Sequence, residues 1–375
     1  MIVAGEISGD THAAGLMREI IAQAPGTQFT GLGGPQMRKI SGEGVEDWLD
    51  SAAVMGLSEV LAKYGYFKRR MADCEAAVAA ETPAAVILVD YPGFNLRLAQ
   101  RIRDQGIRTR IIYYISPQVW AWKKGRLKQM AKTLDLMICI FPFEKPLFEK
   151  SGLRTEFAGH PMMDRVLTLR RPWEREPGLV GWFPGSRVDE VRRLFPVMLA
   201  AARLIKTQVP EARFAVSAAN EFLASTMRDL AESCGMPEAR GWIETGTVYD
   251  LMQRAQAGVV ASGTATLEAA CFGLPYALIY KVAWPTYVVA KALVRIKFIG
   301  IINVLAGREV VRELIQQLCT PEKVAAAMVE LLTSPEKRHA LQEDLAGVVA
   351  TLGDTGAYAR AAQAALKVLE QGGNA

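Results

Sequence analysis

The stretch Ala85-Val-Ile-Leu-Val-Asp-Tyr-Pro-Gly-Phe-Asn95 runs from an uninterrupted apolar segment through a turn into a helix-length amphipathic segment. An apolar run without polar alternation is typical of a parallel strand whose two faces are both covered by helices. Asp90 would then stand at the carboxyl end of that strand, the edge at which open α/β sheets bind their ligands. Because the same strand-to-helix pattern recurs along the chain, the sequence predicts an α/β fold.

Two successive blocks of this pattern predict two domains, separated by a charged, proline-bearing linker at Arg170–Pro177. In the first block we expect strands at Ile2–Ala4, Gln28–Gly31, Ala85–Val89, Arg110–Ile115 and Leu136–Ile140, with helices such as Thr11–Gln23 and Phe94–Gln105. In the second we expect strands at Leu179–Phe183, Arg213–Ser217, Gly258–Ala261 and Tyr276–Tyr280, with helices at Val188–Thr207, Glu221–Cys234 and Thr266–Phe272. Helices are expected to dominate from Val310 onward.

The predicted architecture is therefore two Rossmann-like open parallel-sheet domains facing a cleft. We place the first domain at residues 1–168 and the second at 178–345, and we expect a C-terminal helix at about 346–375 to pack back on the first domain. A chain of 375 residues is too long for one ordinary core, which favours the same division.

Composition narrows the class of protein. Five scattered cysteines without a C-x-x-C pair indicate reduced thiols and a cytoplasmic protein, and only three histidines argue against a metal site. We expect no cofactor and no nucleic-acid partner. No uncharged run approaches the ~20 residues of a membrane span, and the opening Met1–Ala4 has no basic leader of a signal peptide. Any contact with a membrane is therefore expected at its surface.

The segment Ser116–Arg126 combines tryptophans with cations. Trp120 and Trp122 directly precede Lys123, Lys124 and Arg126. Between residues 97 and 132 ten basic residues face one acid, so this region is more positive than the whole chain, whose net charge is +5. Aromatic rings beside cations suit an anionic partner with an apolar part, such as a phosphorylated lipid at a membrane surface. A solvated basic helix beside an ordinary core strand would show the same pattern.

Two strand–loop–helix junctions in the second domain could bind phosphate. Gly185, Ser186 and Arg187 precede a helix whose first N–H groups form an anion site, to which Arg187 can add a bidentate contact. The alternative is a tight turn with Ser186 as N-cap. The second junction holds Ser262, Gly263 and Thr264, followed by Glu268, which could accept both hydroxyls of a ribose or could simply complement the helix dipole. Neither loop is a G-x-x-x-x-G-K-[ST] phosphate loop, and no D-x-D occurs.

The first domain offers several acid–base candidates at strand ends. Asp90, partly shielded by its aromatic neighbours, is a plausible general base, with helix capping, shared with Asn95, as the alternative. The first strand ends in Gly5-Glu-Ile-Ser-Gly-Asp-Thr-His12, where Glu6, Asp10 and His12 are rivals, and Ser8 adds a hydroxyl. His160 ends another strand, but a lone histidine there is more often structural.

A second amphiphilic patch extends from Val54 to Arg70 and includes Met55, Tyr66 and Phe67. It is either a helix with a buried face or an apolar surface, ringed by cations, that dips into a headgroup layer.

Taken in order, these motifs resemble the lipid-A-disaccharide synthase family. The resemblance rests on G-E-I-S-G-D at 5–10, V-M-G-L-S-E-V-L at 54–61, D-Y-P-G-F-N at 90–95, S-P-Q-V-W-A-W at 116–122, F-P-F-E-K at 141–145, G-H-P at 159–161, P-G-S-R at 184–187, S-G-T-A-T-L-E at 262–268 and N-V-L-A-G-R-E-V-V-R-E-L-I-Q at 303–316. The resemblance covers nearly the whole chain.

The resemblance implies a glycosyltransferase of the B-type fold, inverting and metal-independent, at the inner face of the inner membrane. Its substrates would be a UDP-linked 2,3-diacylglucosamine donor and a 2,3-diacylglucosamine 1-phosphate acceptor, and its products a β-1′,6-linked disaccharide and UDP. It further implies a homodimer with exchanged C-terminal segments.

For individual residues, we expect Asp90 to take the acceptor proton and Arg187 to stabilise the departing diphosphate. The resemblance implies that Glu268 holds the ribose and that Asn303, Glu313 and Gln316 line the donor side. Glu6, Ser8 and Asp10, with the tryptophan segment and the amphiphilic patch, are expected on the acceptor and membrane side. The alternatives are a UDP-sugar 2-epimerase of the same fold, which would not need the tryptophan–cation segment, and a non-catalytic lipid- or nucleotide-binding module.

Overall fold

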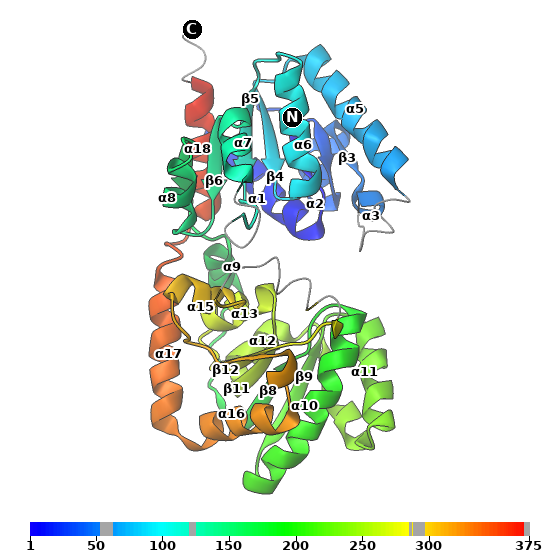
Figure 1. Cartoon of the computed structure of the whole chain (residues 1–375), viewed down its shortest axis with the longest axis vertical. Helices are drawn as coiled ribbons and strands as arrows, with labels where there is room; N and C mark the ends of the chain where they lie inside the picture. The colour runs from blue at the N-terminus through cyan, green and yellow to red at the C-terminus, as the bar shows by residue number, and fades with distance from the viewer. Residues whose placement is uncertain (53–62, 120–124, 285–286, 288–296, 371–375) are drawn as a thin grey trace. The chain divides into compact units, whose positions relative to one another are not determined.

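The computed structural model describes residues 1–52, 63–119, 125–284, 287 and 297–370 (Figure 1). The chain forms two compact units, Met1–Met163 with Leu352–Ala375, and Asp164–Thr351. The expected domain borders at 168, 178 and 345 differ from these limits. The stretch at Arg170–Pro177 that was expected to be a linker lies within the second unit, and its last two residues begin a strand at Glu176. The C-terminal segment belongs to the first unit from Leu352 onward.

The first unit is built on a seven-stranded parallel sheet with the order β3-β2-β1-β4-β5-β6-β7. Its strands are β1 (Ile2–Ala4), β2 (Gly31–Gly33), β3 (Val45–Asp47), β4 (Ala85–Val89), β5 (Arg110–Tyr114), β6 (Leu136–Cys139) and β7 (Thr155–Phe157). The strand expected at Gln28–Gly31 lies later in the chain, as β2. Strand propensity does not predict β2 well, because glycine has a low propensity for strands. Glycine is needed at Gly31, which faces the backbone of β1, since a Cβ there would lie 2.1 Å from the Ile2 carbonyl oxygen.

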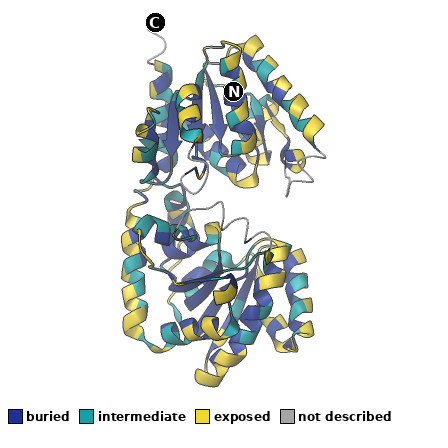
Figure 2. Cartoon of the chain, in the orientation of Figure 1, coloured by how far each residue is buried: buried dark blue, intermediate teal, exposed yellow. Residues whose placement is uncertain are grey.

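Helices cover both faces of this sheet, which explains why the strands β1, β4 and β6 are apolar throughout. Along β4, Ile87 and Val89 face a core shared with α1 (Ile7–Gln23) and α18 (Ala357–Glu370), whereas Val86 and Leu88 face the opposite core. Figure 2 shows the central strands of the sheet as buried. Among the described residues, the other α-helices of this unit are α2 (Pro35–Ser41), α3 (Leu49–Ala52), α5 (Tyr64–Glu81), α6 (Pro92–Asp104), α7 (Arg126–Thr133) and α8 (Glu144–Glu149); α9 (Met162–Leu169) crosses the border to the second unit.

The second unit repeats this plan with a six-stranded parallel sheet of order β10-β9-β8-β11-β12-β13. Its strands are β8 (Glu176–Phe183), β9 (Arg213–Ala218), β10 (Ile243–Thr245), β11 (Ala255–Ala261), β12 (Tyr276–Tyr280) and β13 (Glu313–Ile315). The α-helices in the described part of this unit are α10 (Val188–Gln208), α11 (Glu221–Ser233), α12 (Val248–Arg254), α13 (Thr264–Cys271), α15 (Ile301–Ala306), α16 (Pro321–Thr333) and α17 (Pro335–Ala350). Helices were expected to dominate from Val310 onward. The edge strand β13 lies in this region and precedes its helices.

Each sheet has one point at which the order of its strands reverses. In the first unit the reversal falls between β1 and β4, and in the second between β8 and β11. The loops that follow these strands diverge to opposite faces of the sheet and leave a crevice at the carboxyl edge, where open α/β sheets bind ligands. The junctions after Ala4, Val89, Phe183 and Ala261 are thus the positions that the topology favours for chemistry.

Among the described helices, none is both long enough and apolar enough to span a bilayer.

Candidate active site

Asp90 stands at the reversal point of the first sheet, directly after β4. Its backbone is left-handed, with φ 45°, as is that of Tyr91, with φ 49°. Three hydrogen bonds hold this conformation: the Asp90 N–H donates to the Tyr114 carbonyl at 3.0 Å, and its own carbonyl accepts from Tyr113 Oη at 2.6 Å and from Asn95 Nδ2 at 2.8 Å. Strained backbone that its surroundings over-determine in this way is typical of functional positions.

The helix-capping alternative for this residue is wrong. The N-cap of α6 is Tyr91, and no described side chain caps that helix. Asn95 does not share such a cap either, because its amide donates to the carbonyls of Val89 and Asp90. Apart from a hydrogen bond that it accepts from the Tyr91 backbone, the Asp90 carboxylate is left for another task.

Burial and a neighbouring charge raise the pKa of Asp90 to about 6. Desolvation is the larger cause, the exposed Glu6 carboxylate at the end of β1 adds to it, and a hydrogen bond from the Tyr91 backbone opposes both. A carboxylate with this pKa is ionised at neutral pH yet basic enough to take a proton in a reaction.

Tyr91 closes one side of this strand end. Its ring lies where a side chain at Gly5 would be, since a Cβ there would come within 2.3 Å of the ring, and its hydroxyl donates to the Ala52 carbonyl at 3.0 Å. Desolvation, followed by the charge of Glu6, raises the pKa of Tyr91 to about 12, so the hydroxyl stays neutral.

The structure gives Asp10 a structural role. Its buried carboxylate accepts hydrogen bonds from the backbone N–H groups of Gly34, Gln36 and Met37, at 2.9–3.0 Å, and so caps α2. Asp10 is thus not a free acid–base group, contrary to its candidacy. Ser8, two residues earlier in α1, is exposed.

The two histidine candidates of the first unit are also held by structural contacts. His160 Nδ1 accepts from the Met162 N–H at 3.1 Å, and burial lowers the pKa of His160 to about 3, with a smaller contribution from His12. His160 is therefore neutral. His12 Nδ1 lies 2.9 Å from the hydroxyl of Tyr358 on α18.

Part of the tryptophan–cation segment falls among the described residues. Ser116 donates to the buried Glu144, and Val119 is buried, so the start of the segment is anchored in the core. Arg126 begins α7 and is half-buried. The expected contacts of Trp120, Trp122, Lys123 and Lys124, and of Met55 in the amphiphilic patch, lie outside the described residues.

The local excess of positive charge is partly neutralised by acids beyond the segment. Arg103 and Arg110 both pair with Asp135, and Arg101 pairs with Glu75 at 2.8 Å. These arginines hold strands and helices together. Tyr66 and Phe67 of the amphiphilic patch belong to α5, are half-buried, and pack edge to face with each other.

The loop after β8 carries the residues that were expected to bind an anion. Gly185 has φ 107°, and a Cβ there would lie 2.6 Å from the Glu190 carboxylate, so only glycine fits. The N-cap of α10 is Arg187, and no described side chain bonds to the first N–H groups of this helix. The alternative in which Ser186 is the cap is thus wrong; Ser186 is exposed. The Arg187 side chain is 65% exposed and pairs loosely with Glu190 at 3.2 Å.

The loop after β11 repeats this arrangement. It lies beside the loop after β8, because β8 and β11 are paired strands. Gly263, with φ 154°, is the N-cap of α13, and here too no described side chain supplies a cap. Thr264 is exposed and Ser262 is partly exposed, so both hydroxyls are accessible. Two uncapped helix N-termini therefore flank the reversal point of the second sheet, and such N-termini attract phosphate groups.

Glu268 is oriented by two residues that the sequence did not single out. Arg165 Nη2 donates to the Tyr249 hydroxyl at 2.7 Å, and this hydroxyl donates to Glu268 Oε1 at 3.1 Å. Burial raises the pKa of Glu268, while Tyr249 and Arg165 lower it. No local motif could have revealed this relay, because the three residues come from α9, α12 and α13.

Asn303, Glu313 and Gln316 form a buried network instead of an open surface. Asn303 bonds to Glu313 at 2.9 Å and to the backbone of Val310 and Val311, and the Glu313 carboxylate accepts the Ile299 and Gly300 N–H groups. Gln316 bonds to both backbone groups of Val282. Every polar atom of these side chains is used within the chain. They hold the segment after β12 to β13, which differs from the expectation that they line the donor side directly.

Comparison with known proteins decides the family. Residues 1–368 match the family model of lipid-A-disaccharide synthetase. The chain belongs to this family. A lipid-A-disaccharide synthase of Syntrophus aciditrophicus is 40% identical over 99% of this chain and 98% of its own length, and that of Geobacter sulfurreducens is 40% identical over 98% and 97%. The chain is therefore a glycosyltransferase of lipid A biosynthesis, and the non-catalytic alternative falls away.

Solved structures of lower sequence identity share the fold. A putative UDP-N-acetylglucosamine 2-epimerase from Listeria monocytogenes matches with a TM-score of 0.65 at 14% identity, over 99% of this chain and 96% of its own. A trehalose 6-phosphate synthase from Burkholderia multivorans matches with a TM-score of 0.51 at 15% identity, over 87% and 79%. These likenesses confirm the glycosyltransferase B-type fold, and the epimerase alternative rests on such a likeness alone.

Proposed function

We propose that this enzyme transfers 2,3-diacylglucosamine from UDP to the 6-hydroxyl of 2,3-diacylglucosamine 1-phosphate, giving the β-1′,6-linked lipid A disaccharide and UDP. The observation that carries the proposal is the Asp90 carboxylate, which combines a pKa of about 6 with a strained position at the reversal point of its sheet. A single in-line displacement needs such a base, because the acceptor hydroxyl must lose its proton as its oxygen attacks the anomeric carbon.

UDP leaves from the opposite face of the sugar, so the anomeric centre inverts. The departing diphosphate needs positive charge, which Arg187 and the uncapped N-termini of α10 and α13 supply in this proposal without a metal ion. Loosening of the Arg187–Glu190 pair frees the guanidinium for the phosphate. Glu268, held by Tyr249, binds the ribose hydroxyls, and Asn303, Glu313 and Gln316 act on the donor site through the backbone that they hold.

The enzyme works, in this proposal, at the anionic inner face of the inner membrane. The support is the excess of positive charge between residues 97 and 132, of which Arg97, Arg108 and Lys128 are exposed.

The deciding experiment incubates the purified chain with both acylated substrates in EDTA and identifies the product by mass spectrometry. We expect a disaccharide and an equal amount of UDP. The Asp90→Asn variant should lose about 10²–10⁴-fold in kcat, the usual contribution of a general base, and still bind UDP. Full turnover by this variant, or a need for a divalent metal, would contradict the mechanism.

A further inference from the structure

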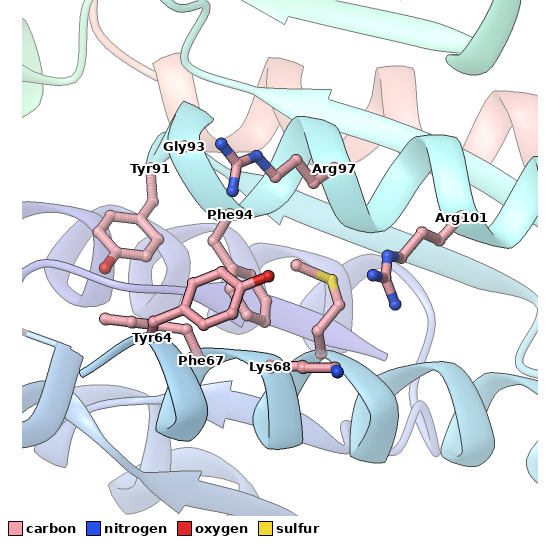
Figure 3. A pocket seen from close by; sticks show the side chains of 9 residues that line it. Tyr64, Phe67, Lys68, Tyr91, Gly93, Phe94, Arg97 and Arg101 are labelled. Atoms are coloured by element: carbon pink, nitrogen blue, oxygen red, sulfur yellow. The ribbon is translucent and has the colours of Figure 1, made fainter. Parts of the chain in front are cut away.

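A pocket of about 320 Å³ opens between α5 and α6 in the first unit (Figure 3). Its floor is apolar, because Met71 from α5 and Phe94 from α6 are both buried. The rings of Tyr64 and Phe67 line one end of it, where Tyr64 is 61% exposed. Large apolar side chains around an open cavity indicate an apolar ligand, since leaving such surface in water is unfavourable.

Three cations stand at the rim of this pocket. Arg97 and Lys68 are exposed, and neither makes a hydrogen bond or ion pair with any residue that the structure describes. Arg101 pairs with Glu75, yet its side chain remains 49% exposed. An apolar cavity with unpaired cations at its mouth is complementary to a molecule that joins a hydrocarbon chain to an anion.

The pocket also adjoins the proposed base. Tyr91, which lines it, directly follows Asp90. We propose that this pocket seats one acyl chain of the monophosphorylated acceptor, and that Arg97 and Lys68 bind its phosphate. The inference rests on the proposed function and deepens it, because it assigns the lipid of the acceptor to a site formed by α5 and α6.

This arrangement would also select the acceptor. A chain between Phe67 and Phe94 and a phosphate on Arg97 hold the sugar at two points, so its hydroxyl is presented to Asp90 in one orientation. A sugar without the phosphate, or with a shorter chain, loses one of these contacts.

The first test narrows the pocket. Gly93 lines the pocket, and no described atom lies within 4 Å of a Cβ placed on it, so the first carbon of the side chain in Gly93→Leu meets open space. Gly65→Leu is the matched control, because Gly65 is an exposed helical glycine with equally open space that does not line the pocket. We expect Gly93→Leu to raise KM for the long-chain acceptor by about fourfold for each methylene excluded, with KM for the donor unchanged.

The second test removes the charge. Arg97→Gln should weaken binding of the acceptor by about tenfold or more, the usual loss of a charge-assisted hydrogen bond. Arg69→Gln is its control, since Arg69 is an exposed arginine of α5 outside the pocket. Dodecyl phosphate, octyl phosphate and dodecanol serve as direct probes in calorimetry. Affinity should fall when the chain is shortened and when the phosphate is lost, and only the wild-type and control proteins should show this order.

The outcomes separate the two proposals. If the wild-type protein forms no disaccharide, the proposed function fails, whereas alkyl phosphate binding that depends on Gly93 and Arg97 still supports the pocket. If the disaccharide forms and both variants keep their acceptor KM and alkyl phosphate affinity, the pocket inference is overturned. If the variants lose binding to phosphatidylglycerol vesicles but keep their acceptor KM, the pocket belongs to a membrane phospholipid, and the inference is likewise overturned.

Discussion

The surroundings of Asp90 lower the stability of the folded protein and raise the basicity of the Asp90 carboxylate. Its side chain is held in a poorly solvated place next to Glu6, and its backbone is held left-handed by contacts from β5 and α6. Poor solvation and the Glu6 charge oppose the ionised form and leave the carboxylate more basic than an exposed one, whereas the left-handed backbone is a conformational cost of the folded state.

The pH dependence of stability follows from this raised pKa. The pKa of Asp90 rises from 3.8, the ordinary value of an aspartate, to about 6, so the folded protein binds more protons than the unfolded chain between these values. The contribution of this group to stability is complete below about pH 4 and is lost as the pH rises through about 6, a change of roughly 3 kcal/mol.

We therefore expect Asp90→Asn to stabilise the first unit at pH 8, by up to about 3 kcal/mol, and to have little effect at pH 4. Native-state hydrogen exchange of β1 and β4 measures this for the first unit alone. In parallel, kcat/KM of the wild-type enzyme should rise with pH to a plateau above about 6. A variant that is less stable than wild type at pH 8 would refute the burial argument.

Tyr249 is the residue-scale test of the donor site. Tyr249→Phe removes the hydroxyl that donates to Glu268 and accepts from Arg165. Because that hydrogen bond lowers the pKa of Glu268, we expect its pKa to rise further, and UDP affinity to fall about fivefold, the value of one ordinary hydrogen bond. The loss should be greater at pH 5 than at pH 8. Calorimetric titration with UDP at both pH values checks this. A Tyr249→Phe variant that binds UDP as tightly as the wild-type enzyme would disprove the role.

At the scale of elements, α2 depends on a residue from α1. The Asp10 carboxylate takes three of the N–H groups at the start of α2, which has only seven residues and could not persist alone. This contact explains why an acid in the first turn of α1 is buried without a counter-ion.

We expect Asp10→Ala to lower the free energy of unfolding of the first unit by roughly 2–3 kcal/mol, because buried N–H groups lose charged partners. Asp50→Ala is the control: Asp50 is an exposed acid at the start of α3, and its loss should change stability by less than about 0.5 kcal/mol. Hydrogen exchange in α2 reports the change directly. Equal protection of α2 in both variants would contradict the capping role.

At the scale of the whole molecule, the last helix belongs to the first unit. α18 packs against α1, burying Ala361, Ala362 and Ala365 in the core that covers one face of the first sheet. Arg360 ties the connection down, since its guanidinium donates to the carbonyls of Ala158, Asp354 and Thr355.

Truncation after Thr351 should therefore unfold or loosen the first unit and leave the second intact. We expect α1 and β1 to lose protection from hydrogen exchange, because the alanine-lined face becomes exposed, while α10 and β11 retain theirs. Truncation after Glu370 is the control, since it leaves α18 whole. Retained protection in α1 after the longer truncation would show that α18 is dispensable.

Local sequence was sufficient for the elements with strong patterns. β4 and β12 have the expected limits, and α10 and α11 differ from theirs by one residue, since long apolar or amphipathic runs leave little choice. It was insufficient for β3, β10 and β13, which have three residues each and are strands only because a neighbour in the sheet supplies their hydrogen bonds.

The sequence by itself determined the α/β class, the junctions at Asp90, Arg187 and Ser262–Gly263, and the family, because these depend on residues close together in the chain. Only the tertiary structure decided that Asp10 is a cap, that Asn303 and Glu313 are buried together, that Tyr249 orients Glu268, and that Arg97 stands over an apolar pocket. The physical reason is that burial, pKa and hydrogen-bond partners come from contacts between distant segments, which exist only once the sheets and helices have packed.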